Sequence, residues 1–266
     1  MKKNFPAFCL VLFLVFITSI AFAQNFLEIK EKATRGDAEA QFKLGRMYDR
    51  GTGVKQDFSQ AKFWWEKAAA QGYIDAQYNL GCMYDQGEGV KQDFAKAVFW
   101  WEKAAAQGDA EAQFNLGNMY DRGAGVKQDF SQAKFWWEKA AAQGLAQAPF
   151  NLGNMYYRGT GVKQDFAQAK FWWEKAAAHG DVKAQYNLGN MYARGEGIKQ
   201  DFAQAKFWWE KAAAQGDAEA QFNLGIMYAR GEGVKQDFSQ AKFWWEKAAA
   251  QGLAKAKEML NKLKSN

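Results

Sequence analysis

Apolar side chains recur along this chain with the spacing of an α-helix, and no segment shows the alternation of a β-strand. Between about residues 38 and 50, Ala40, Leu44 and Met47 lie at i, i+4 and i+7, which is one face of a helix with about 3.6 residues per turn. Gly51 follows directly, and glycine readily takes the left-handed conformation that ends a helix. The pattern predicts a helix over 38–50.

A second helix is predicted to begin after Asp57, an N-cap residue with Gln60 three positions later, as in a capping box. We expect it to end at Gly72, as the first helix ends at Gly51. Its apolar residues share one face at 100° per residue, and they are Phe58, Ala61, Trp64, Trp65, Ala68 and Ala69. Both tryptophans are therefore expected to be core residues, and the alanines to allow neighbouring helices to approach closely.

This two-helix pattern recurs every 36 residues, at Gly36, Gly72, Gly108, Gly144, Gly180, Gly216 and Gly252. Six near-identical units follow, over residues 36–71, 72–107, 108–143, 144–179, 180–215 and 216–251. All 12 tryptophans belong to the six Trp-Trp pairs of these units. A hairpin of 36 residues cannot bury its apolar face alone, so the units are expected to stack on one another.

Each end of the repeat array carries a segment that is expected to form a capping helix. Residues 24–35 contain Phe26 and Ile29. Residues 252–266 place Ala256, Leu260 and Leu263 on one side and lysines on the other. Such caps give a stack of repeats polar outer faces.

Residues 1–23 have the features of a secretory signal peptide. Lys2 and Lys3 precede an apolar run that closes in small residues at Ala23, where cleavage is expected. The alternative, an uncleaved membrane anchor, requires about 20 apolar residues and usually more. No small residue directly precedes Cys9, so lipid modification is not expected. We expect a bacterial protein that acts in the periplasm or outside the cell and is not inserted in the membrane after cleavage.

Charge and cysteine content narrow the classes of function. Without the two signal-peptide lysines, 33 basic residues (35 − 2) face 29 acidic ones, spread evenly through the repeats. The sequence has no basic patch of the kind that would indicate a nucleic-acid partner. Cys82 is the one cysteine left after cleavage, so no disulfide can form within a monomer. A monomeric or weakly associating protein is expected.

The repeat consensus resembles a known family. Ala-x-x-Asn-Leu-Gly-x-x-Tyr-x-x-Gly-x-Gly-Val, followed by Asp-Phe-x-x-Ala-x-x-Trp-Trp-x-x-Ala-Ala, is similar to the Sel-1-like repeat, a relative of the tetratricopeptide repeat, over residues 36–251. The resemblance implies an all-α, right-handed α-solenoid of six helix-turn-helix repeats with caps at both ends. It places the first helix of each repeat (helix A) on the concave side and the second (helix B) on the convex side. It also implies a scaffold that binds proteins.

Two features depart from the family pattern. Cysteine-rich members carry a disulfide in each repeat, whereas the repeats of this chain lack the cysteine pairs that such disulfides require. Family members also place an apolar residue where Lys62 stands and a polar one at Phe63, so this pair is exchanged in five of the six repeats. The second repeat has Val98 and Phe99 instead.

An enzymatic alternative arises from Ser-x-x-Lys, the nucleophile motif of β-lactamases and penicillin-binding proteins, because cysteine-rich relatives have been described as β-lactamases. The motif occurs at Ser59, Ser131 and Ser239, but the other repeats have alanine there. The partner motifs Ser-Asp-Asn and Lys-Thr-Gly are absent from the sequence. His179 is the single histidine, so His-based catalysis and a metal site are not expected. We expect no catalytic residue, metal or cofactor.

A Phe row is predicted on the outer side of helix B. Phe63 lies about 200° from Ala61 around the helix and is expected to point away from the Trp pair. Its ring either packs over Lys62, Glu66 or the next helix B, or forms an exposed contact surface for a partner or a second copy. The row is Phe63, Phe99, Phe135, Phe171, Phe207 and Phe243.

An Asn row on helix A is the candidate peptide-binding site. Asparagine is a poor helix former, so another role favours it there. In tetratricopeptide relatives the corresponding Asn holds the backbone of a bound peptide. The row is Asn79, Asn115, Asn118, Asn151, Asn154, Asn187, Asn190 and Asn223, with Arg122, Arg158, Arg194 and Arg230 a turn further on.

A solvated Asn row, or one that bonds helix to helix, is the competing interpretation. From the repeats and the Asn row together we expect a non-catalytic scaffold that binds an extended peptide or protein segment. The alternatives are a β-lactamase-like or cell-wall enzyme, and a structural spacer without a specific ligand.

Overall fold

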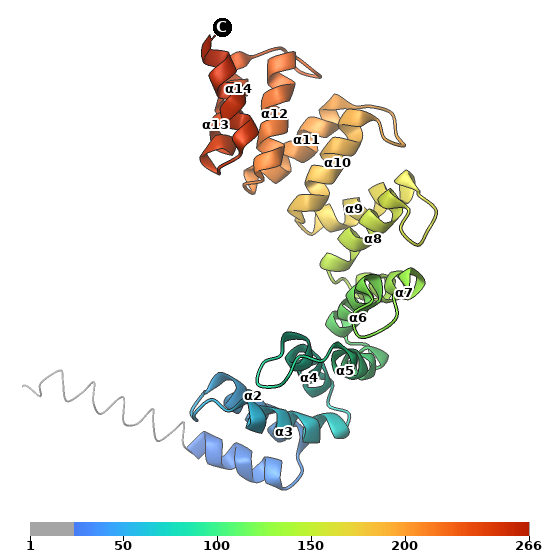
Figure 1. The fold of residues 1–266 in the computed structure, drawn as a ribbon, viewed down its shortest axis with the longest axis vertical. Helices are drawn as coiled ribbons and strands as arrows, with labels where there is room; N and C mark the ends of the chain where they lie inside the picture. Colours follow the sequence, from blue (N-terminus) through green and yellow to red (C-terminus); the bar gives the residue numbers. More distant parts are fainter. Residues whose placement is uncertain (1–23, 266) are drawn as a thin grey trace, which may run out of the picture. The chain divides into compact units, whose positions relative to one another are not determined.

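The computed structural model describes residues 24–265, and the predicted signal peptide lies outside this range. The described part is all-helical, with a first helix over residues 24–34 and no strand (Figure 1). The other helices are α2 (Ala38–Arg50), α3 (Phe58–Ala70), α4 (Ile74–Gln86), α5 (Phe94–Ala106), α6 (Ala110–Arg122), α7 (Phe130–Ala142), α8 (Gln147–Arg158), α9 (Phe166–Ala178), α10 (Val182–Arg194), α11 (Phe202–Ala214), α12 (Ala218–Arg230), α13 (Phe238–Ala250) and α14 (Ala254–Ser265).

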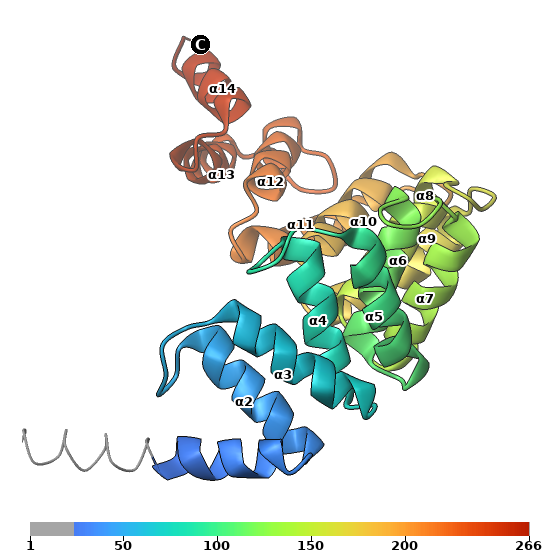
Figure 2. The same cartoon turned by 60° about the horizontal axis from the view of Figure 1, so that its bottom comes forward.

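The described residues form two compact units, 24–128 and 129–265, which divide between α6 and α7. Within the first unit α2 packs on α3, α4 packs on α5, and each pair contacts the helix that follows it. The second unit repeats this arrangement with the pairs α8/α9, α10/α11 and α12/α13, after which α14 packs on α13. The helix over 24–34 lies beside α2 (Figure 2), where Phe26 and Ile29 pack against Leu44 and Trp64.

The predicted helix boundaries are confirmed in the first repeat. Helix α2 ends at Gly51, which takes φ 67°, in the left-handed region where a side chain is strained. Asp57 caps α3 by accepting a hydrogen bond from the backbone N–H of Gln60. The reciprocal half of the predicted capping box is wrong, because the backbone N–H of Asp57 donates to the carbonyl of Tyr48 at 2.9 Å. The cap residue therefore also links helix B to helix A of its own repeat.

The prediction that both tryptophans of each pair are core residues is only partly confirmed. In the first repeat Trp64 and Trp65 are both buried. In the later repeats the second Trp is buried while the first is half-buried. The fully packed members are Trp101, Trp137, Trp173, Trp209 and Trp245. The helix over 24–34 explains the exception, since it covers Trp64 in the first repeat.

A row of buried glutamines, which the sequence analysis did not single out, connects consecutive helices. Gln77 on α4 donates to the carbonyl of Ala69 at the end of α3, and its own oxygen accepts from Gln107 at the end of α5. One amide pair thus links three helices, with both polar atoms of the buried side chain satisfied. The buried members are Gln41, Gln77, Gln113, Gln185 and Gln221.

The fourth repeat lacks this glutamine pair. Pro149 stands where the other repeats have the buried Gln, and His179 stands where they have its partner. Leu145 also replaces a capping residue, and α8 begins at Gln147 without a side-chain cap. Pro149 lies in the first turn of α8, where its missing N–H costs little. The junction between α7 and α8 therefore lacks the glutamine link that Gln77 and Gln107 provide at the junction between α3 and α4.

Installing the missing pair is expected to strengthen that junction. With Pro149→Gln and His179→Gln together, the two amides should bond and add about 1 kcal/mol of coupling to the free energy of unfolding. Each replacement alone gains little, since one amide then lacks its partner. A double-mutant cycle from urea unfolding measures this coupling, and a coupling of zero contradicts the role of the pair.

Candidate functional site

The predicted Asn row lies at the edge of the packed core. The first helix of each repeat buries one Ala together with its Leu, Gly and Met, whereas all eight predicted asparagines are half-buried. We call the surface formed by these asparagines and the arginines one turn further on the helix A face, described separately in each unit. Side chains at this depth lose part of their hydration, so their polar atoms need partners.

Several of these asparagines bond to other helices. Asn223 on α12 donates from Nδ2 to Oδ1 of Asn190 on α10, at 3.1 Å. Trp173 Nε1 donates to Oδ1 of Asn154, at 3.2 Å. At these positions the helix-to-helix bonds of the competing interpretation are present. An amide has one acceptor oxygen and two N–H groups, so each such bond uses only part of its hydrogen-bonding capacity.

The predicted arginine row divides into two kinds. Arg194 and Arg230 are exposed and form ion pairs with Glu196 and Glu232, at 3.3 Å and 3.4 Å. Ala124 and Thr160 occupy the corresponding positions after Arg122 and Arg158. The charges of Arg194 and Arg230 are therefore neutralised by neighbouring glutamates, which the spacing of the arginines alone did not indicate.

The first repeat carries basic residues where the others carry the Asn row. Lys43 and Arg46 occupy the two Asn positions of α2, and Arg50 follows one turn later. Lys43 forms an ion pair with Glu39. These residues were not predicted from the sequence, because the candidate row was defined by its asparagines, although the departure of the first repeat from the consensus was a signal for them.

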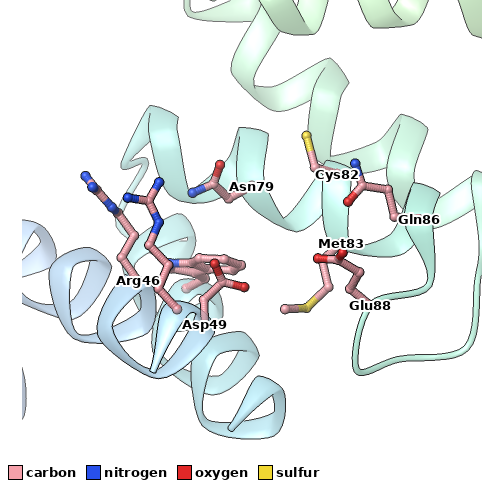
Figure 3. Close-up of a pocket in the computed structure, with 9 residues that line it drawn as sticks. Arg46, Asp49, Asn79, Cys82, Met83, Gln86 and Glu88 are labelled. Carbon is pink, nitrogen blue, oxygen red and sulfur yellow. The ribbon is translucent and has the colours of Figure 1, made fainter. Parts of the chain in front are cut away.

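Figure 3 shows a pocket of about 170 Å³ between α2 and α4 in the first unit. The carboxylates of Asp49 and Glu88 point toward each other across it. Burial and the neighbouring Glu88 raise the pKa of Asp49, while Arg50 and Arg46 oppose that shift. Asn79, Cys82 and Met83 supply further walls from α4.

Cys82 occupies an Asn position of this face and is half-buried. Burial raises the pKa of its thiol, and the neighbouring Tyr78 and Trp101 side chains oppose the shift. The thiolate is the reactive form of cysteine, so a raised pKa makes this thiol less reactive. These surroundings favour an unreactive thiol over one that forms an intermolecular disulfide.

Cys82 in the folded protein is expected to react slowly with a thiol-reactive disulfide reagent at pH 8. The rate should be lower than in the urea-unfolded chain by about tenfold or more, because burial limits both access and ionisation. A protein with Cys9→Ser leaves Cys82 as the single thiol for this measurement. Equal rates in the folded and unfolded chains contradict the assignment.

The Phe row is exposed, with 43–49% of each residue accessible to solvent. Phe63 nevertheless contacts the ring of Trp64 edge-on, with centroids 5.0 Å apart, so the prediction that it points away from the Trp pair is wrong. The side chain folds back along its own helix, where Lys67 Nζ lies 4.9 Å from the ring centroid. The covering lysine is thus at i+4, rather than the predicted Lys62 or Glu66.

Lys62 lies at the junction of two repeats. It forms an ion pair with Glu66 at 2.9 Å, and the hydrogen bond with Glu66 is the main cause that raises the pKa of Lys62. Tyr84 of the next repeat contributes to the same shift. This contact explains why lysine is tolerated at a position that is apolar in the family. A Ser-x-x-Lys mechanism needs a lysine that can accept a proton, and this environment favours the protonated form.

In the second repeat Val98 takes the position of Lys62 and is buried. There the hydroxyl of Tyr120 lies 3.4 Å from Glu102, so tyrosine reaches the glutamate without the lysine between them.

No group of three or more His, Cys, Asp or Glu side chains within residues 24–265 is arranged to hold a metal ion. Of the helices in that range, none combines the length and apolar character needed to cross a membrane.

Comparisons with known proteins agree with this architecture. Six consecutive segments match the family described as Sel1 repeat, over residues 38–73, 74–109, 110–145, 146–181, 182–217 and 218–253. No curated protein matches the chain in sequence.

Similar solved structures include two proteins with this repeat. The first is a protective antigen of uropathogenic Escherichia coli that displays an SLR fold, with 41% identity over 88% of this chain and a TM-score of 0.84. The chain spans 50% of that protein's length. The second is a Sel1 repeat protein from Oxalobacter formigenes, with 38% identity, a TM-score of 0.68, and coverage of 81% of this chain and 89% of that one.

The family matches cover most of the chain, and the two similar structures share the same helical repeat. Proteins built from these repeats typically act as protein-interaction scaffolds and are generally non-catalytic. The fold is accordingly an α-solenoid of six 36-residue helical hairpins. By sequence and structure, this chain belongs to the Sel1 repeat family.

Proposed function

We propose that the protein is an exported, non-catalytic scaffold that binds an extended peptide segment of a partner protein along the helix A face. The observation that carries this proposal is the row of half-buried amides on successive helices. Asn190 and Asn223 are close enough to bond, so neighbouring repeats supply adjacent polar groups rather than isolated ones. An extended peptide, which has no internal hydrogen bonds, requires such a series.

Side-chain amides suit a ligand of varied sequence. They offer both donors and an acceptor, so they pair with main-chain N–H and C=O groups whatever the peptide's side chains are. The Asn190–Asn223 bond uses Oδ1 of one amide and Nδ2 of the other, and leaves Nδ2 of Asn190 and Oδ1 of Asn223 for a ligand. The contacts between helices then orient the amides in advance, which lowers the entropic cost of binding.

Apolar and charged groups flank the amides. Arg122 and Arg158, which lack a following glutamate, supply positive charge for an acidic side chain. Half-buried aromatic rings stand beside the row and offer apolar contact, namely Phe114, Phe150, Tyr186 and Phe222. These features favour protein binding over a spacer without a ligand, and the raised pKa of Lys62 weighs against the β-lactamase-like alternative.

Removing three amides is expected to weaken binding while the fold persists. With Asn115, Asn151 and Asn187 all changed to Ala, each lost hydrogen bond costs about 0.5–1.5 kcal/mol, so affinity falls by at least tenfold. Helicity holds or rises, because alanine is the better helix former. Cross-linking capture of the native partner from the envelope fraction, with circular dichroism of the purified variant, measures both effects.

A matched control changes three exposed loop lysines, Lys127, Lys163 and Lys199, to Ala. This control variant should capture the partner as the unchanged protein does. If the folded Asn variant also captures it normally, the helix A face is not the binding surface.

A further inference from the structure

A second pocket in the first unit lies between the helix over 24–34 and α2, and has a volume of about 270 Å³. Ile29 and Met47 give it an apolar wall, and Lys43, Arg46 and Arg50 give it a basic one. Within the described part of the chain no acidic side chain lines it. Asp49 and Glu88 line the neighbouring pocket between α2 and α4, which Arg46 and Arg50 also border from its other side.

The positive charge of this pocket resides on two arginines. Lys43 is paired with Glu39, whereas Arg46 and Arg50 form no ion pair within residues 24–265. They are one turn apart and project from the same side of α2. The Arg46 guanidinium lies 5.7 Å from the ring centroid of Phe42, and in Figure 3 its side chain points away from the two carboxylates.

We infer that this pocket binds the C-terminal residue of a peptide when that residue is apolar. Its carboxylate bonds to the guanidinium groups of Arg46 and Arg50, which match carboxylate geometry. Its side chain packs on Ile29 and Met47. This assignment rests on the proposed function, since it places one end of the bound peptide at the first repeat.

A chain end fits the pocket better than an internal acidic residue. A C-terminal apolar residue carries a carboxylate and an apolar side chain on the same Cα, and the pocket presents both kinds of wall side by side. An internal Asp or Glu supplies the charge without the apolar group. The helix over 24–34 contributes Asn25 and Ile29 to one wall, which faces the arginines of α2 across the pocket.

N-acetyl-leucine is the probe that tests the assignment on the purified protein. In NMR titrations it should shift the Met47 methyl signal and the Arg46 and Arg50 side-chain N–H signals. N-acetyl-leucinamide, which lacks the charge, and N-acetylglycine, which lacks the side chain, should each bind at least tenfold more weakly. Equal binding of the amide, or absence of shifts at these residues, overturns the assignment.

The variant Arg46→Gln with Arg50→Gln should bind N-acetyl-leucine at least tenfold more weakly. Its matched control is Arg194→Gln with Arg230→Gln, which removes two arginines that are already paired with glutamate and should leave binding unchanged. Equal loss in both variants indicates general charge attraction and overturns the assignment.

The two proposals fail separately. If the Asn variant loses its partner while N-acetyl-leucine does not bind, the inferred pocket is wrong and the helix A face stands. If the probe binds while the Asn variant keeps its partner, the helix A proposal is the one that fails.

Discussion

Changing Gly189 to Ala is expected to destabilise the second unit by about 1–3 kcal/mol, although alanine is normally the better helix former by about 1 kcal/mol. A Cβ at Gly189 would lie 2.3 Å from Cδ1 and 2.5 Å from Nε1 of Trp209. The indole is buried and cannot move aside without disturbing α10 and α11. The clash therefore outweighs the gain in helix propensity, and urea unfolding measures the balance.

The same experiment in a second background tests the cause. With Trp209→Leu the indole is gone, so adding Gly189→Ala should cost much less than it does in the unchanged protein. The two replacements are then coupled in a double-mutant cycle. An unchanged cost in the Leu background means that the indole is not what requires glycine at this position. The same close approach recurs at Gly45, Gly81, Gly153 and Gly225.

Changing Trp173 to Ala is expected to cost about 3–5 kcal/mol, as for other large buried aromatic residues. Trp173 is 2% exposed and packs with Ala184, Leu188 and Met191 of the next repeat. Trp172 in the same pair is half-buried, so Trp172→Ala should cost clearly less. The two variants differ by one position in the chain, which makes each the control for the other. Equal costs would contradict the assignment of the second tryptophan as the core residue.

The damage from Trp173→Ala should also be local. Each repeat contacts its neighbours, so hydrogen exchange is expected to rise first in α8, α9 and α10, the helices that share this core cluster. Amides in α13 and α14 should exchange at nearly their original rates. A uniform rise across the second unit would show that its repeats unfold as one cooperative body.

The helix boundaries were predictable from the sequence because their causes are local. A glycine that takes a left-handed conformation ends a helix, and an aspartate that caps one acts within three residues. The predicted segment 38–50 and the Asp57 cap agree with α2 and α3. The capping box was wrong because the N–H of Asp57 is used by Tyr48, nine residues away.

The candidate site was predictable only in outline. Spacing placed the Asn row on one side of helix A, and in the structure each of these residues is half-buried. It could not show that Asn190 bonds to Asn223 or that Arg194 is neutralised by Glu196, because such partners depend on how side chains are packed. Arg46 and Arg50 were not predicted as site residues, because they line pockets beside α2 that form only when the helices pack together.

The array of six helical hairpins follows from local features of the chain, namely its 36-residue period, its helix-ending glycines and its capping aspartates. Which tryptophan of each pair is buried, which glutamines link three helices and where Phe63 lies became clear only from the packing of the helices. The difference arises from the distance along the chain between the residues in contact. These contacts join residues on different helices or different repeats. Because the repeats are nearly identical, each residue has several equivalent possible contact partners, and only the packing of the helices selects one of them.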